Sequence, residues 1–176
     1  MIIWIILILS IITFISLLII KKPVQRNILS GISIILLIIS IFLLIANLSS
    51  HYGMEKITIS KTKQIYTASP QNIQIKMIAV KKIGASNIIA IYRENPNEAE
   101  ATAHFTPSTK ILESIKHTSK LYIVNENLSA TVTTKTTKWE YKSKFYKALF
   151  YTQETDNVVK IENYINIPSN WKIIYK

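Results

Sequence analysis

Histidines and carboxylates are the side chains with which this chain could carry out acid–base or metal chemistry, and their spacing favours neither. His51, His104 and His117 are far apart in sequence, and none has a second histidine or a carboxylate at the spacing of a zinc site. Asp156 is the only aspartate and lies in an expected turn, which argues against an aspartate-assisted triad. No phosphate-binding glycine loop, nucleophile elbow or zinc-protease motif occurs. We therefore expect no enzyme activity, no cofactor and no metal site.

Two other sources of chemistry are equally poor. Glu94, Glu98 and Glu100 cluster around an asparagine- and proline-containing loop, but a calcium site needs a denser array of oxygen ligands. We interpret these glutamates as solvated loop carboxylates. The chain has no cysteine, which excludes disulfides, thiolate metal ligands and a cysteine nucleophile.

The first 50 residues are two apolar runs separated by a short basic loop. Residues 1–20 and 27–50 contain no charged side chain, and each is as long as the roughly 20 residues needed to cross a bilayer. No Lys or Arg precedes the first run and a basic loop, residues 21–26, follows it, unlike a cleavable signal peptide. The sequence therefore predicts a transmembrane hairpin over residues 1–50, with membrane lipid around it.

The charges beside the spans indicate a topology. Lys21, Lys22 and Arg26 lie in the six-residue loop, which favours the cytoplasmic side by the positive-inside rule. Lysines between residues 56 and 63 flank the other end and oppose this, but long domains cross a membrane with little regard to charge. We expect a cytoplasmic loop in the cell membrane, with both termini and the following domain outside the cell.

Small and hydroxyl-bearing residues form a stripe on each apolar run. The candidates for helix packing are Ser10, Thr13, Ser16, Ser33, Ser40 and Asn47. Such residues let helix backbones approach closely and form hydrogen bonds across the contact. Two interpretations stay open: the two helices pack on each other through these faces, or one stripe docks on another membrane protein. Because neither run contains a charge, the hairpin offers no ion path of its own.

After a short junction at residues 51–56, residues 57–176 show the period of two that is typical of strands. Ile57 and Ile59 alternate with Thr58 and Ser60, and turn residues recur at strand-like intervals. Strands are expected at 57–65, 73–80, 88–92, 120–124, 131–142, 145–151, 158–167 and 171–175, with a helical turn at 108–116. The pattern predicts an all-β domain, an antiparallel barrel or sandwich.

Four aromatic residues of this domain have two interpretations. Trp139, Tyr141, Tyr146 and Trp171 are typical of a carbohydrate- or peptide-binding platform, but bulky aromatics also dominate core energetics. We favour a core role for them.

The domain is strongly basic. With Glu55 and Lys56 of the junction it holds 18 of the 21 Lys and Arg residues and all ten acidic residues, a net charge of about +8. This favours an anionic neighbour, such as lipid headgroups, an envelope polymer or an acidic protein. Nucleic acid is not expected, because the lysines are scattered and no nucleic-acid motif occurs.

The junction lacks a flexible linker. His51 and Tyr52 are ring residues of the kind found at headgroup depth, and Gly53 permits a turn that other residues resist. We expect these three residues to hold the domain at a fixed angle close to the bilayer.

Four segments carry a resemblance that covers almost the whole chain. They are residues 51–56 (HYGMEK), 139–142 (WEYK), 145–150 (FYKALF) and 167–171 (IPSNW). With the two spans, they resemble a family of uncharacterised two-span membrane proteins from lactic acid bacteria and their relatives. The resemblance transfers no catalytic residue. Proteins similar to this family are encoded beside multidrug efflux transporters of the major facilitator type. The resemblance therefore implies that the protein is an accessory subunit of a polytopic membrane partner. The alternative is a surface module that binds an anionic envelope polymer such as a teichoic acid.

Overall fold

The chain folds into two compact units. The computed structural model describes residues 1–176 except 71–72, 85–86, 152–156 and the side chain of Leu112. Met1–Lys56 and Trp139–Asn157 form one unit, which we call the hairpin unit. Ile57–Lys138 and Val158–Lys176 form the other, the sandwich unit. Trp139–Asn157, which the sequence pattern assigned to the β domain, thus clusters with the apolar helices instead.

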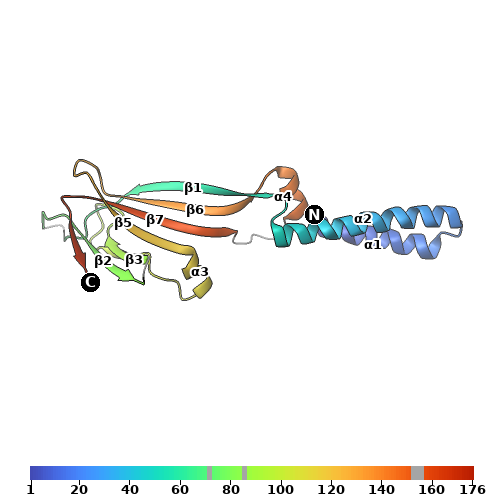
Figure 1. The fold of residues 1–176 in the computed structure, drawn as a ribbon, viewed down its shortest axis with the longest axis horizontal. Coiled ribbons are helices and arrows are strands. Elements are labelled where there is room, and N and C mark those ends of the chain that lie inside the picture. The colour runs from blue at the N-terminus through green and yellow to red at the C-terminus, as the bar shows by residue number, and fades with distance from the viewer. Residues whose placement is uncertain (71–72, 85–86, 152–156) are drawn as a thin grey trace. The chain divides into compact units, whose positions relative to one another are not determined.

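Two antiparallel helices make up most of the hairpin unit (Figure 1). They are α1 (Ile2–Ile19) and α2 (Pro23–Ser50), and both are long and apolar enough to cross a membrane. Pro23 opens α2, where its missing N–H and fixed φ suit the first turn of a helix. The prediction of two long apolar helices at this end of the chain is confirmed.

A short helix, α4 (Lys144–Phe150), completes the hairpin unit. We expected a strand at 145–151 from its aromatic residues, and that prediction is wrong. The Ser143 side chain accepts a hydrogen bond from the Tyr146 amide at 3.3 Å and so caps the helix N-terminus. Tyr146 and Phe150 then fall four residues apart on one helix face, with ring centroids 6.2 Å apart. The cap and this spacing outweigh the strand preference of the aromatics.

The described residues form two four-stranded sheets, which lie in the sandwich unit except for the start of β1 and the end of β6, which belong to the hairpin unit (Figure 1). The first has the order β1-β6-β7-β5, with β1 (Met54–Gln64), β6 (Thr131–Tyr141), β7 (Val158–Pro168) and β5 (His117–Val124). The second has the order β4-β3-β2-β8, with β4 (Thr102–His104), β3 (Asn87–Tyr92), β2 (Met77–Ile83) and β8 (Lys172–Tyr175). The helical turn predicted before β5 is present as α3 (Ile111–Lys116).

The β domain is confirmed in its sandwich form, not as a closed barrel. Both sheets are mixed, whereas the sequence pattern suggested antiparallel pairing throughout. β5 runs parallel to β7 from the pair His117–Ile161 to Val124–Pro168, and β2 runs parallel to β8. A period of two shows which side chains share a face of the sheet, but it carries no information on strand direction. The error is therefore one that alternation alone cannot correct.

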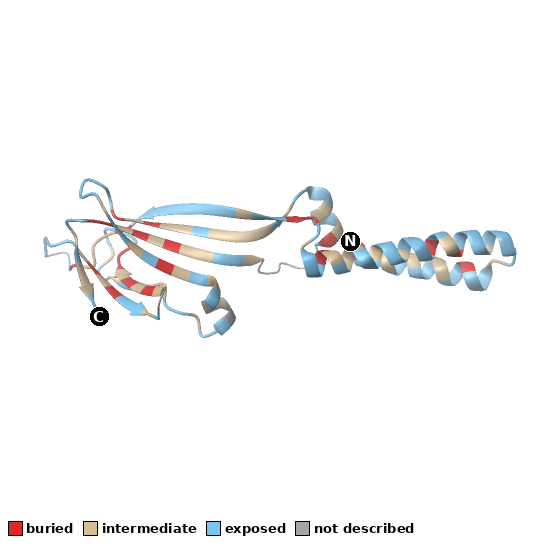
Figure 2. Ribbon diagram, in the orientation of Figure 1, coloured by how far each residue is buried: buried red, intermediate tan, exposed pale blue. Residues whose placement is uncertain are grey.

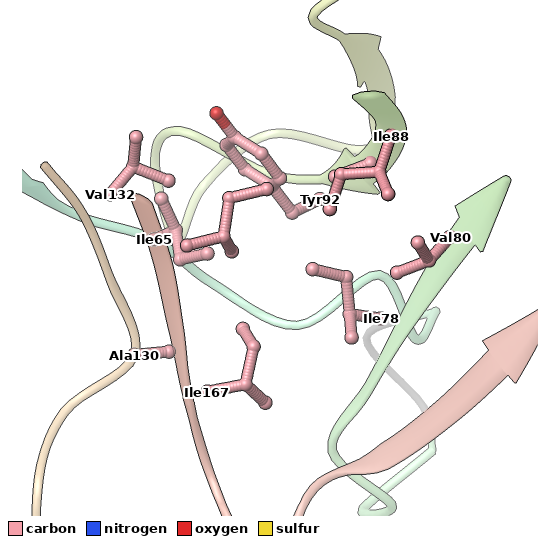
Figure 3. Close-up of a cluster of buried hydrophobic side chains, with 10 residues drawn as sticks. Ile65, Ile78, Val80, Ile88, Tyr92, Ala130, Val132 and Ile167 are labelled. Atoms are coloured by element: carbon pink, nitrogen blue, oxygen red, sulfur yellow. The ribbon is translucent and has the colours of Figure 1, made fainter. Parts of the chain in front are cut away.

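The core of the sandwich unit lies between the sheets (Figure 3). Ile78 of β2, Ala90 of β3, and Ile165 and Ile167 of β7 are fully buried. Every second residue is buried along β3 and in the first half of β2 (Figure 2, red), so the alternation read from the sequence is the alternation of the core there. Burying each such isoleucine contributes about 1.5–3 kcal/mol.

Candidate functional site

A tight turn ends α2 and begins the candidate site. His51 has φ 55° and ψ 34°, the left-handed conformation that often ends a helix. The Met54 amide donates to the His51 carbonyl at 2.9 Å, and Gly53 has φ 81°. The side-chain amide of Asn47 donates to the Tyr52 carbonyl at 2.7 Å. Asn47, which we considered as part of a helix-packing stripe, thus holds this turn.

Gly53 is enclosed by α4. A Cβ atom at Gly53 would lie 2.6 Å from Cδ1 of Tyr146, closer than any normal carbon contact. The Lys142 amide also donates to the Gly53 carbonyl at 3.0 Å. Residue 53 therefore has to be glycine, both for its positive φ and for the approach of the Tyr146 ring.

Aromatic rings gather around this turn. We define the hairpin-end cluster as His51, Tyr52, Gly53, Trp139, Tyr146 and Phe150. The His51 ring stacks on Trp139 with centroids 4.2 Å apart and an interplanar angle of 12°. The edge of Tyr52 meets Tyr146 at 5.9 Å and Phe150 at 6.4 Å. Ring pairs in these geometries contribute about 0.5–1.5 kcal/mol each beyond their buried area.

The first residues of α1 close the cluster from the other side. The Met1 nitrogen donates to the carbonyls of Ala148 and Leu149 at 3.2 and 3.0 Å. These carbonyls belong to the last turn of α4, where no amide of the same helix can reach them and where positive charge is favoured. Ile2 and Phe150 are only 1% and 2% exposed. The start of α1 and the turn that ends α2 are thus both held against α4.

The solvent side of the cluster combines rings with lysines. Phe145 is 68% exposed and Tyr151 43% exposed. Lys142, Lys144 and Lys147 are exposed beside them, and Nζ of Lys147 lies 5.9 Å from the Tyr151 ring centroid. Aromatic rings with neighbouring lysines form the composition that segments at a membrane–water interface have.

Two tyrosines of the hairpin unit, Tyr52 and Tyr141, have a raised pKa. The hydrogen bond with Tyr146 is the main reason why the pKa of Tyr52 is raised above its usual value. Burial is the main reason why the pKa of Tyr141 is raised. A raised pKa disfavours the phenolate, so Tyr52 and Tyr141 are not suited to act as bases near neutral pH.

The helix-packing candidates fall into two groups. The Thr13 hydroxyl donates to Ser33 across the helix pair at 2.9 Å, and Ser16 and Ser33 are buried. The Ser10 hydroxyl is exposed and donates to a carbonyl one turn earlier at 2.8 Å. Ser40 is half-buried, and its hydroxyl also donates to a carbonyl one turn earlier, that of Leu36, at 2.8 Å. The two helices therefore contact each other through the first group, while Ser10 lies on the outer surface.

The aromatic candidates are split between the two units. Trp139, Tyr141 and Tyr146 belong to the hairpin unit and not to the sandwich core in which we expected them. Trp171 packs against that core and is half-buried. The sequence pattern therefore did not reveal that three of the four form or adjoin the hairpin-end cluster.

The carboxylates of Glu94 and Glu98 contact neighbouring side chains. Glu94 lies 3.7 Å from Lys63 and 3.8 Å from His104. The carboxylate of Glu98 accepts from the side chain of Asn95 at 3.0 Å, which lowers the pKa of Glu98. Within the described part of the chain, no three His, Asp or Glu side chains are grouped so as to hold a metal ion. Asp156 lies outside the described residues.

Two apolar helices, a lysine- and aromatic-rich helix at their end and a mixed β-sandwich define a helical-hairpin protein with a β-sandwich domain. The chain belongs to the family defined by the domain of unknown function DUF4811, whose model matches residues 21–175. The match includes the basic loop, α2 and all eight strands. No curated protein and no solved structure matches the chain. The expected likeness to an uncharacterised family is confirmed at this level.

Proposed function

We propose that the protein is a non-catalytic, membrane-anchored interaction protein that assists a polytopic membrane partner, such as an efflux transporter of the major facilitator type. The surface of α1 and α2 carries this proposal. Trp4, Phe14 and Phe42 are each 66–69% exposed, as are most other apolar side chains of the two helices. Exposing apolar surface to water costs about 25 cal/mol per Å². Lipid or another membrane protein removes this cost.

The hairpin-end cluster supports the same anchoring. The exposed Phe145 and Tyr151 beside the cluster, with the lysines next to them, suit the headgroup region at the end of a transmembrane hairpin. The basic loop at the other end of the two helices is then cytoplasmic, and the sandwich unit is outside the cell.

Ser10 is the feature that favours a protein partner. Its side chain lies on the outer surface of α1, within the apolar span that a bilayer would surround. Small and hydroxyl-bearing residues at such positions allow another helix to approach closely. We therefore assign the Ser10 side of α1 to the contact with the partner.

Affinity capture tests this proposal. The full-length chain, tagged at its C-terminus and expressed at native level, is extracted in a gentle detergent, captured and analysed by mass spectrometry. We expect one polytopic membrane protein to be recovered with it. Ser10→Phe should reduce the recovery, and Ile8→Phe, which places the same ring on another exposed side of α1, should leave it unchanged. Recovery of the chain alone, or equal loss with both variants, would contradict the proposal.

One face of the first sheet favours a second function, binding of an anionic envelope polymer. Lys120 of β5 and Lys135 of β6 lie on the same face as Tyr164 of β7, as the strand register shows. Nζ of Lys135 is 5.1 Å from the Tyr164 ring centroid. The exposed lysines thus surround a half-buried ring, and the one carboxylate on this face near them, Glu162, is bound to Lys160 at 2.7 Å.

Polymer binding is measured with the full-length chain in nanodiscs of uncharged lipid. Soluble poly(glycerol phosphate) should bind, and its affinity should fall as ionic strength rises. Lys120→Gln combined with Lys135→Gln should weaken binding, whereas Lys81→Gln, at an exposed residue of β2 in the other sheet, should not. Salt-insensitive binding or no binding would remove this function.

A further inference from the structure

The sandwich unit contains a cavity of about 470 Å³ among its loops. The segment after β1, the loop between β5 and β6, and the turn between β7 and β8 contribute to its wall. Because β5 and β7 are parallel, the loops that follow them emerge at the same end of the sheet (Figure 1). This volume lies within the range of small-molecule sites, and loops on a rigid β scaffold are frequent binding elements.

A buried arginine forms part of the cavity wall. Arg93 is 6% exposed and follows the last residue of β3. Its backbone is fixed by two hydrogen bonds with the backbone of Tyr66, at 2.9 and 3.1 Å. Its Nε donates to the Thr67 carbonyl at 2.8 Å and its Nη1 to the Glu98 carbonyl at 3.1 Å. The guanidinium is therefore held in one position.

Within the described residues, the guanidinium of Arg93 has no carboxylate partner. The neighbouring acidic side chains are engaged elsewhere: Glu94 with Lys63 and His104, and Glu98 with the side chain of Asn95. A buried positive charge without a counter-ion is unfavourable, so an anion that reached Arg93 would stabilise the fold as well as bind.

The guanidinium also has hydrogen-bond donors to spare. It carries five N–H groups, and the two carbonyl contacts use one on Nε and one on Nη1. No enclosed side-chain nitrogen of the described residues lacks a partner, so Nη2, for which no partner is seen, is not fully enclosed although the residue as a whole is buried. The cavity that Arg93 lines is the space that Nη2 can reach.

The residue type is informative too. Arg93 is one of two arginines among 21 basic residues in a chain that otherwise uses lysine. The planar guanidinium matches the two oxygens of a carboxylate or phosphate, which a lysine ammonium cannot do.

The rest of the wall indicates what accompanies the anionic group. Lys76 adds a second cation and Glu126 a single carboxylate, so the charged side chains of the wall sum to +1, and Tyr66 and Trp171 contribute aromatic side chains. Trp171 packs against the sandwich core, which limits its movement. The side-chain amides of Asn127 and Asn170 can both donate and accept hydrogen bonds, as hydroxyl groups require.

We propose that this cavity is a binding site for a compact polyol or sugar that carries one oxyanion, a phosphate or a carboxylate. The oxyanion binds the guanidinium of Arg93, with Lys76 nearby, and the hydroxyl-bearing part lies against Trp171 and the two asparagines. The site is separate from the lysines around Tyr164 and does not depend on the function proposed above.

Calorimetry and thermal stability of the full-length chain in nanodiscs of uncharged lipid test this site. The probes are glycerol 3-phosphate, glucose 6-phosphate and glucuronate, with glycerol, glucose and inorganic phosphate as matched references. At least one of the anionic polyols should bind saturably and raise the melting temperature, at least about tenfold more tightly than its neutral counterpart. Nanodiscs with phosphatidylglycerol, titrated without any soluble probe, show whether a lipid headgroup occupies the same site.

Variants identify the cavity. Arg93→Lys keeps the charge and should weaken binding at least about tenfold, because it removes the fork. If that variant does not fold, Lys76→Gln and Asn127→Ala, both at exposed residues, decide: each should weaken binding several-fold. Lys135→Gln, outside the cavity, should leave it unchanged. No binding up to about 10 mM, equal binding of neutral and anionic probes, binding of the lipid headgroup alone, or insensitivity to these substitutions would overturn the proposal.

Discussion

Replacing Gly53 should open the hairpin-end cluster, because the position combines a positive φ with a direct clash. An alanine there would adopt a left-handed conformation at φ 81°, which costs about 1–2 kcal/mol. Its Cβ would also meet Cδ1, Cγ and Cε1 of Tyr146 at 2.6, 2.9 and 3.1 Å. Overpacking of this kind costs about 1–3 kcal/mol. Gly53→Ala should therefore lower the stability of the cluster by about 2–5 kcal/mol, and Gly53→Val by more.

Gly84 provides the matched control. It also has a positive φ, 60°, but a Cβ there meets nothing within 4 Å. Gly84→Ala should therefore show the backbone cost of about 1–2 kcal/mol alone. The difference between the two alanine variants isolates the clash with Tyr146.

Hydrogen–deuterium exchange of the full-length chain measures the effect. The amides of Lys144–Phe150 report the opening of α4, and Gly53→Ala should speed their exchange while Gly84→Ala should not. Adding Tyr146→Ala removes the clashing ring, so the double variant should lose less stability than the two single variants sum to. Equal effects at Gly53 and Gly84, or simple additivity with Tyr146→Ala, would show that the reasoning is wrong.

Three further predictions concern other parts of the chain. Because the protein has no cysteine, Gln25→Cys and Asn97→Cys each introduce a single site for labelling. In whole cells a maleimide that cannot cross the membrane should react with residue 97 and not with residue 25. The reverse result would invert the proposed topology. Ser143→Ala removes the cap of α4 and should cost about 1 kcal/mol, read as faster exchange in that helix; an unchanged rate would show that the cap is dispensable. The Asn95 hydrogen bond lowers the pKa of Glu98 below 4.5, so the stability that this carboxylate contributes is present above pH 4.5 and is lost as the pH falls through the lower pKa of the folded state. Glu98→Gln should remove this part of the acid sensitivity in a pH titration of stability. An unchanged titration would contradict the assignment.

The elements that the sequence predicts well are those whose signal lies in one stretch of chain. Two runs without charge are enough to predict α1 and α2, and alternation is enough for most strands. Strand direction depends on which distant strands become neighbours, and therefore the parallel pairs β5–β7 and β2–β8 were missed. The strand expected at 145–151 failed because a single cap, Ser143, decides the local conformation.

The candidate sites were less predictable than the fold. His51, Tyr52 and Gly53 were identified from their place beside an apolar run, but their partners Tyr146 and Phe150 are remote in sequence. Arg93 gave no signal beyond its rarity, because a charged residue after a strand is ordinarily exposed. Its burial arises from the bridge to Tyr66 and from the loop around Glu98, both products of tertiary folding.

The spacing of the hairpin-end cluster along the chain has a consequence for biosynthesis. Tyr52 leaves the ribosome roughly ninety residues before Tyr146, which at roughly 5–20 residues per second is an interval of roughly 5–20 seconds. During that interval the two apolar helices exist without α4, and the turn at Gly53 has no ring beside it. Closure of the cluster therefore comes after most of the β-strands have been synthesised. A chain that stops before residue 139 would keep an open hairpin end, because Trp139, Tyr146 and Phe150 supply the rings that pack against His51 and Tyr52.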